Sequence, residues 1–245
     1  MTTVGFIYPG HAAEDDYPLA EKLLGEGLTL AVEHIYGEDV YAVEQLKELG
    51  SRDRLADGVQ RLSKYQPDSV MWAGTGSSFV YGLDGAQRHV DELSGAASVP
   101  ASSTSLAFIH AVRALDLQRV AVSASYPVEV TDLFGQFLAD AGIEVVNLAA
   151  AEIATATEVG QLGGKAVIDL IVGYDHPEAE AMLVPDTAMR TFGLVNDVEE
   201  QIGKPVLTAN QVTIWEGLRL AGDHRTVPNA GALLRPNTPG RHAER

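Results

Sequence analysis

Cysteine is absent from the 245-residue chain, and basic residues are few. Without thiols there can be no disulfide, no thiolate nucleophile and no cysteine-bound metal. The formal net charge is −17, because the chain has 34 Asp and Glu residues but only 17 Lys and Arg residues. Nucleic-acid binding needs a cationic surface, so this composition argues against it. A small anion would have to be held by local backbone N–H groups and hydroxyls, because the overall charge repels it.

Long apolar runs are missing as well. No run reaches the roughly 18 residues that a membrane-spanning helix needs. The stretch "MTTVGFIYPG" lacks the basic and apolar regions of a signal peptide. We therefore expect no membrane partner and a cytoplasmic protein. Apolar residues make up 46% of the chain, which suffices for a folded core.

Short β-rich runs alternate with helical patterns along the chain. We predict strands near 3–8, 29–35, 68–74, 118–125, 143–148, 180–185 and 204–208. The helices are predicted near 14–26, 41–65, 79–93, 104–116, 129–141, 157–174, 193–202 and 210–221. This alternation predicts an α/β fold with parallel sheets. In such folds, ligands bind at the carboxyl ends of the strands.

The order of short motifs also repeats once. "VGFIYP" is similar to "VAVSASYP", "AGT" to "PDT", and "VPASSTS" to "KPVLTAN". We therefore predict two similar Rossmann-like lobes related by a pseudo-twofold axis. Their expected bounds are 1–100 and 101–222, with crossing segments between them and an irregular tail at 223–245. This symmetry would place Gly74 and Asp186 on facing walls of one interlobe cleft.

Several of these stretches resemble the aspartate/glutamate racemase superfamily, in its branch of maleate isomerase and arylmalonate decarboxylase. The resemblance is carried by "WAGTGSSFVYG", "LVPDTAMRT" and "GKPVLTANQVTIWEGLRLAG", among others. It implies an active site between two α/β lobes, with no cofactor and no metal. Racemases and the isomerase use one cysteine from each lobe as acid and base. Here these positions are Gly74 and Asp186, so two-thiol chemistry is not available.

Arylmalonate decarboxylase resembles this chain in one further respect, because it too has glycine at the first position and keeps only the second cysteine. The resemblance implies that an enediolate would be held by groups of Thr75, Gly76, Tyr126, Asp186 and Thr187. The missing side chain at Gly74 would leave room for a substituent. Two substrate-binding asparagines of the isomerase fall near Ala12 and Ala156, so both anchors are missing.

The role of Asp186 stays open at this stage. Burial against apolar groups would raise its pKa and keep it protonated, ready to donate a proton. An ionised Asp186 would instead act as a base toward carbon or water. A carboxylate in this position can also simply cap the following turn.

Two other residues allow a functional and a structural interpretation. His11 follows the first predicted strand and is a candidate substrate-binding residue or second acid/base, or else a solvated loop histidine. Arg190 could bind a carboxylate or support the structure. The acidic run at 14–16 and the "YDHPE" stretch do not have a convincing metal-ligand pattern, so we expect no metal site.

Taken together, the residues and the resemblance predict a cofactor-independent enzyme. It would act on a small carboxylic or carbonyl acid through an enolate or enediolate. The first choice is a decarboxylase similar to arylmalonate decarboxylase, with Asp186 replacing the thiol. The alternatives are a carboxylate-based isomerase, lyase or hydrolase with Asp186 as general base, or a non-catalytic small-molecule binding protein. The sequence leaves a homo-oligomer open.

Overall fold

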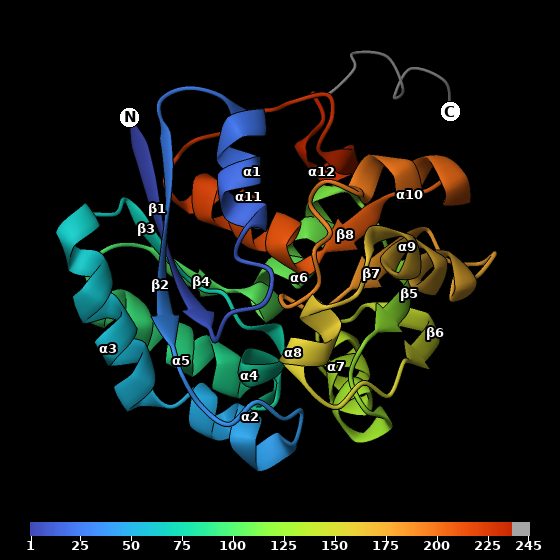
Figure 1. Cartoon of the computed structure of the whole chain (residues 1–245), viewed down its shortest axis with the longest axis horizontal. Coiled ribbons are helices and arrows are strands. Elements are labelled where there is room, and N and C mark those ends of the chain that lie inside the picture. Colours follow the sequence, from blue (N-terminus) through green and yellow to red (C-terminus); the bar gives the residue numbers. More distant parts are fainter. Residues whose placement is uncertain (237–245) are drawn as a thin grey trace.

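The structure of the protein, a computed structural model, describes residues 1–236. Its core consists of two four-stranded parallel sheets surrounded by helices (Figure 1). The first sheet has the order β2-β1-β3-β4 and contains β1 (Thr2–Pro9), β2 (Leu28–Ile35), β3 (Ser69–Trp72) and β4 (Ala101–Ser103). The second has the order β6-β5-β7-β8 and contains β5 (Arg119–Ala124), β6 (Glu144–Ala150), β7 (Ala181–Val184) and β8 (Val206–Thr208). The two orders correspond strand by strand, which confirms the predicted fold class and the repeat.

Helices connect the strands in both halves. In the first half they are α1 (Asp16–Leu24), α2 (Val43–Leu49), α3 (Arg52–Leu62), the short 3-10 helix η1 (Ser63–Tyr65), α4 (Thr75–Phe79) and α5 (Gly82–Ala97). They continue with α6 (Thr104–Ala114), α7 (Val128–Asp140), α8 (Ala156–Gly160), α9 (Gly164–Gly173), α10 (Val195–Ile202), α11 (Ala209–Leu220) and α12 (Gly231–Leu234). Within residues 1–236, none of these helices is long and apolar enough to cross a membrane.

The central strands are short and apolar because helices cover both faces of each sheet. Every residue of β3 ("SVMW") and of β7 ("AMLV") is buried. Both strands therefore form part of the core along their whole length. Their carboxyl ends deliver Gly74 and Asp186 into the loops where a ligand site is expected.

Helix α11 belongs to the second half by sequence but packs against α6 and the strands of the first sheet. Gly217 allows this close approach, because a Cβ there would lie 2.5 Å from a methyl carbon of Val4. The Ser69 hydroxyl donates to the Gly217 carbonyl oxygen at 2.7 Å. The end of the second half therefore packs against the first sheet.

Three predicted helices are each broken in two, namely 41–65, 79–93 and 157–174. The first breaks at Gly50, where a Cβ would lie 2.6 Å from the carbonyl oxygen of Ser77. The second starts earlier, as α4, and resumes as α5 at Gly82, which has a φ of +68°. The third is interrupted within the glycine-rich stretch "GQLGG". These breaks follow from close packing and turn geometry, which helical periodicity does not reveal.

Two elements were absent from the prediction. β4 is only three residues long, yet it pairs in parallel with β3, so the first sheet continues past the boundary expected at residue 100. α12 lies in the tail that was expected to be irregular, where it buries Leu234. The rest of that tail, residues 237–245, lies outside the described residues.

Candidate active site

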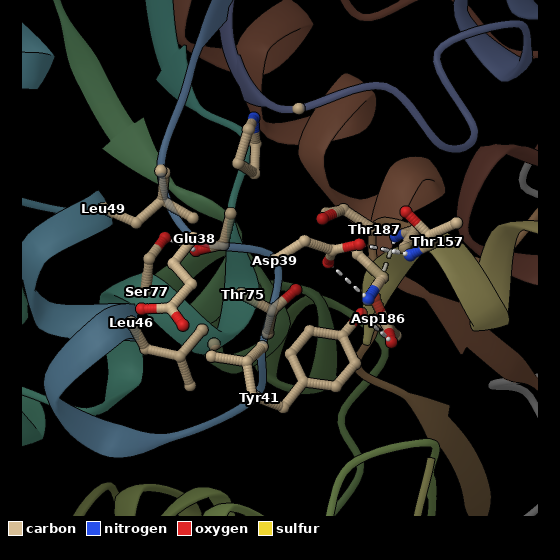
Figure 2. A pocket seen from close by; sticks show the side chains of 18 of the residues that line it. Glu38, Asp39, Tyr41, Leu46, Leu49, Thr75, Ser77, Thr157, Asp186 and Thr187 are labelled. Carbon is tan, nitrogen blue, oxygen red and sulfur yellow. Dashed lines mark hydrogen bonds between the residues drawn. The ribbon is translucent and has the colours of Figure 1, made fainter. Parts of the chain in front are cut away.

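A cavity of about 150 Å³ lies where the carboxyl ends of β1, β3, β5 and β7 meet (Figure 2). The loop at 37–41 and helix α8 complete its wall. The residues predicted from the sequence all line it, namely His11, Gly74, Thr75, Gly76, Tyr126, Asp186 and Thr187. The fold thus brings residues from both halves of the chain to one cavity. The size of this cavity suits a small molecule.

Asp186 follows β7 and is only 2% exposed. Its Oδ1 accepts the backbone N–H of Ala188 at 2.8 Å. Its Oδ2 accepts the Tyr41 hydroxyl at 2.8 Å and also the Ser125 hydroxyl. The carboxyl group is therefore held in one orientation by donors from three different parts of the chain.

Burial raises the pKa of Asp186 above its ordinary value, although the hydrogen bonds from Ser125, Ala188 and Tyr41 oppose the rise. A buried carboxyl of this kind keeps its proton to a higher pH than an aspartic acid in water. The Ser125 and Tyr41 hydroxyls can donate to the carboxylate or accept from the carboxylic acid. The N–H of Ala188 can only donate, so the set as a whole favours the carboxylate and opposes the effect of burial.

The opposite wall begins with Gly74, the N-cap of α4, in an extended conformation. A Cβ at Gly74 would overlap the Ser77 Oγ, so this turn is built around glycine. The next residue, Thr75, is buried, and its hydroxyl meets no hydrogen-bond partner among residues 1–236. A buried hydroxyl without a partner is costly unless a ligand or water satisfies it. Thr75 therefore offers a buried donor to whatever occupies the cavity.

Two tyrosines occupy matching positions at the ends of β1 and β5. The Tyr8 hydroxyl accepts the N–H of Ala13 at 3.0 Å and donates to the Thr187 carbonyl oxygen at 2.7 Å. The Tyr126 hydroxyl donates to the Pro185 carbonyl oxygen. Both tyrosines therefore anchor the backbone on either side of Asp186, so Tyr126 has a structural contact in addition to its predicted contact with substrate.

A buried polar network supports the Asp186 turn from behind. Asn210, at the start of α11, donates to the Thr187 carbonyl oxygen at 3.2 Å and to Asp16 Oδ2 at 2.9 Å. Asp16 Oδ2 also accepts the N–H groups of Thr191 at 3.0 Å and Phe192 at 3.2 Å. This network ties the turn after β7 to helix α1 of the first half.

The loop before α2 closes the cavity from the side. Asp39 accepts the N–H groups of Ala156 at 2.8 Å and Thr157 at 3.1 Å, at the start of α8. The backbone N–H of Tyr41 donates to the Ala154 carbonyl oxygen at 2.8 Å. These bonds hold the loop of the first half against α8 of the second, and they place Tyr41 over Asp186.

The charged lining of the cavity is almost entirely acidic. Glu38, Asp39 and Asp186 line it, together with His11, and no lysine or arginine is among the lining residues that the structure describes. The mouth would therefore repel a doubly charged anion more strongly than a singly charged or neutral molecule.

His11 and Arg190 lie differently with respect to the cavity. His11 lines the rim, but its ring nitrogens contact Glu14 at 2.9 Å and Tyr36 at 3.0 Å, and its side chain is 56% exposed. Arg190 does not line the cavity and pairs with Asp15 at 2.9 Å. For Arg190 the geometry favours structural support over carboxylate binding.

The sequence analysis missed Tyr41, Ser125 and Asp39. Tyr41 falls at the start of the helix predicted over 41–65, whereas the structure leaves it in the preceding loop. Ser125 directly precedes Tyr126 in the repeated "SASYP" motif, which was a usable signal. Nothing in the sequence connects Asp39 to α8, which begins more than a hundred residues later.

Comparison with known proteins extends this picture. Residues 26–234 match the family model described as arylmalonate decarboxylase. The chain is 25% identical to the arylmalonate decarboxylase of Bordetella bronchiseptica over 186 residues, which cover 75% of each protein. It is 30% identical to the maleate isomerase of Geobacillus stearothermophilus over 138 residues, 56% of this chain. That second match spans about half of the relative, 55% of its length.

Solved structures of the same enzymes have the same fold. A maleate cis–trans isomerase of Nocardia farcinica, with a covalently bound succinylcysteine intermediate, has a TM-score of 0.87 at 23% identity and covers 97% of this chain and 99% of its own. A crystal structure of arylmalonate decarboxylase has a TM-score of 0.75 at 24% identity and covers 95% and 98%. With a family model that spans most of its length and the same two-sheet architecture, this chain belongs to the arylmalonate decarboxylase family.

Proposed function

We propose that the protein is a cofactor-independent enzyme that forms an enolate or enediolate from a small acid, and that its reaction is a decarboxylation. The observation that carries the proposal is the buried carboxyl group of Asp186, whose pKa is raised by burial. It shares a small cavity with the buried hydroxyl of Thr75, which has no hydrogen-bond partner among residues 1–236. The names of the relatives, arylmalonate decarboxylase and maleate isomerase, support chemistry on a small acid.

In the proposed step, the bond between the α-carbon of a malonate-like acid and one carboxylate breaks. Carbon dioxide leaves, and the electron pair stays on the substrate as an enediolate. The Thr75 hydroxyl and the backbone N–H groups of Gly76 and Thr187 would hold the enediolate oxygens in a site that excludes water. Protonated Asp186 then donates its proton to the α-carbon and regains one from water, so atoms and charge balance.

A second candidate reaction rests on two other features of the same site. The carboxyl group of Asp186 accepts hydrogen bonds from Tyr41, Ser125 and Ala188, which suit an ionised carboxylate. The acidic lining disfavours a substrate with two negative charges. With a carbonyl acid of one charge, ionised Asp186 could remove a proton from carbon, as in an isomerase or lyase, or from water, as in a hydrolase.

Proton NMR in heavy water separates the two reactions. The enzyme would be incubated with substituted malonates, maleate-like diacids, and cyclic diketones or imides. Loss of carbon dioxide with one deuterium incorporated supports the decarboxylase. Exchange, isomerisation or hydration without carbon loss contradicts it and supports Asp186 as base. If no compound of the panel reacts but product analogues still bind, the result would favour the binding-protein alternative.

Asp186→Asn is the matched test of the residue, since the amide has the same shape and can still accept from Ala188. We expect it to abolish turnover while leaving binding of a product analogue. Asp169→Asn, on the exposed face of α9, is the control and should keep full activity. Full activity in Asp186→Asn would contradict both catalytic roles. The cytoplasmic location and any homo-oligomer stay predictions.

A further inference from the structure

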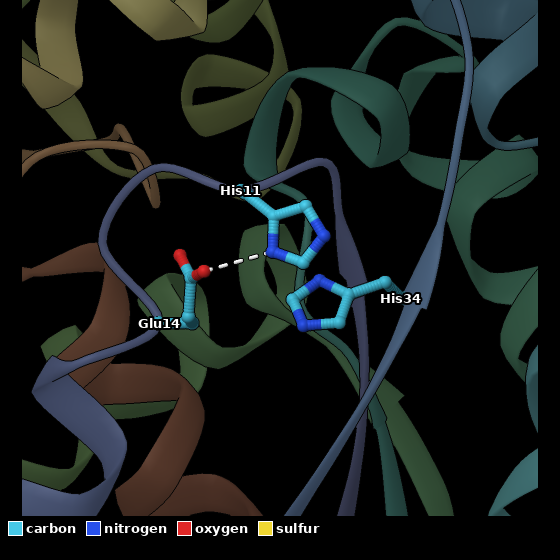
Figure 3. Close-up of side chains that lie close together, drawn as sticks. All are labelled: His11, Glu14 and His34. Carbon is cyan, nitrogen blue, oxygen red and sulfur yellow. Dashed lines mark hydrogen bonds and ion pairs between the residues drawn. The ribbon is translucent and has the colours of Figure 1, made fainter.

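Three side chains lie close together beside the turn that follows β1 (Figure 3). They are His11 in the loop after β1, Glu14 just before α1, and His34 in β2. One ligand-type atom from each lies within 4.8 Å of those of the other two. Two imidazoles and a carboxylate at this spacing form a donor set that metal sites commonly use.

The parallel pairing of β1 and β2 brings these residues together. Tyr8 is the register partner of His34, so His34 stands beside the last residues of β1. Gly10, with a φ of +63°, then turns the chain, and its N–H donates to the Ile35 carbonyl oxygen at 2.9 Å. The turn places the ring of His11 over that of His34, with centroids 3.9 Å apart.

Neighbouring backbone groups orient two of the donors. The Gly10 carbonyl oxygen lies 2.5 Å from His34 Nδ1, so Nδ1 carries the hydrogen and the Nε2 lone pair is free. A carbonyl that fixes the tautomer in this way is typical of histidines that bind metals. The N–H of Ala12 donates to Glu14 Oε2 at 2.8 Å and holds that carboxylate in place.

Each ring nitrogen of His11 already has a hydrogen-bond partner. Glu14 Oε1 lies 2.9 Å from His11 Nδ1, while His11 Nε2 lies 3.0 Å from the Tyr36 hydroxyl. A neutral His11 with its hydrogen on Nδ1 donates to Glu14 and accepts the Tyr36 hydroxyl at Nε2, so both nitrogens are satisfied. A metal ion would take the place of the Nδ1 hydrogen, where the Glu14 carboxylate already faces the ring.

We propose that His11, Glu14 and His34 bind one divalent transition-metal ion, such as Zn²⁺. Imidazole nitrogens favour Zn²⁺, Co²⁺ or Ni²⁺ over Mg²⁺ and Ca²⁺, which take oxygen ligands. The exposed position of His11 leaves further coordination positions to water or a ligand. His11 also lines the Asp186 cavity, so the ion would add positive charge to an acidic mouth. The sequence suggested no metal site because His34 is far from His11 and Glu14 along the chain.

Titration with metal alone tests the site independently of any reaction. The full-length chain, freed of metal by a chelator and dialysed, would be titrated with Zn²⁺ and, separately, with Co²⁺, whose visible spectrum reports its ligands. We expect one ion per chain. His11→Ala and His34→Ala should each weaken binding by at least about tenfold, since even residues behind the ligands contribute that much.

His224→Ala is the control, because His224 is an exposed histidine outside the cluster. This variant should bind the metal ion with unchanged affinity. Circular dichroism of each variant checks its folding. If His34→Ala proves unstable, His11→Ala still tests the site, because it alters only an exposed loop. The absence of saturable one-to-one binding would overturn the proposal and leave His11 hydrogen-bonded to Glu14 without a metal. Binding that survives both His11→Ala and His34→Ala would overturn it too.

Discussion

Replacing Tyr41 with phenylalanine removes the hydroxyl that donates to Asp186 and changes little else. The hydroxyl donates to Asp186 at 2.8 Å, whereas the ring packs edge-on against Tyr126 with centroids 4.7 Å apart, a contact that phenylalanine keeps. A hydrogen bond to a charged group contributes about 1.5–3 kcal/mol. Because about 1.4 kcal/mol corresponds to one pH unit, losing this bond should move the kinetic titration of Asp186 upward by about one to two pH units.

The assay is the pH dependence of kcat/KM, which reports the free enzyme. If Asp186 is the proton donor, activity falls as pH rises, and this alkaline limb moves upward in Tyr41→Phe. If Asp186 is a base, activity falls as pH drops, and the acidic limb moves upward instead. Tyr65→Phe, an exposed tyrosine outside the cavity, should leave both limbs in place. A Tyr41→Phe profile identical to that of the wild type would refute the assigned link between Tyr41 and Asp186.

Three stability changes follow from other contacts and can be measured by urea denaturation. Asp186→Asn should stabilise the fold at alkaline but not at acidic pH, because burial raises the folded pKa of Asp186 and stability is lost as pH rises through it. Gly74→Ala should lower stability by about 1–3 kcal/mol, because the added Cβ would overlap Ser77 Oγ. Glu216→Gln should lower stability by about 1–3 kcal/mol, because the buried carboxylate accepts Arg219 Nε at 2.7 Å. Burial raises the pKa of Glu216, but the bond from Arg219 and others lower it overall, so this loss should shrink as pH falls through the folded pKa.

The fold was largely predictable because parallel strands buried on both faces are short apolar runs between helices. Seven strands and their alternation with helices came from this pattern. β4 did not, because "ASS" has no apolar signal and becomes a strand only by pairing with β3. The break at Gly50 was hidden for a similar reason, since it depends on Ser77, a residue distant in sequence.

The residues of the candidate site were likewise predictable only where local sequence marks them. Gly74 and Asp186 were found because each follows a strand in a repeated motif, so local sequence marks them. Tyr41 and Asp39 act through residues more than a hundred positions away, and only the folded chain brings them to Asp186 and α8. The cluster of His11 and His34 likewise depends on strand register. Positions set by local turns are readable, whereas partners set by tertiary contact are not.

The difference between the two matching turns limits the chemistry of the cavity. One wall carries a titratable carboxyl group at Asp186, and the matching position on the other is Gly74, which has no side chain. Burial raises the pKa of Tyr41 and Tyr126 well above the ordinary value, with a further contribution from the charge of Asp186, so neither phenol ionises near neutral pH. Of the two matching turns, only the one with Asp186 carries a side chain that can exchange a proton, so we expect proton transfer from that wall. An enzyme built in this way should give one enantiomer of a chiral product, whereas racemisation needs an acid or base on both walls.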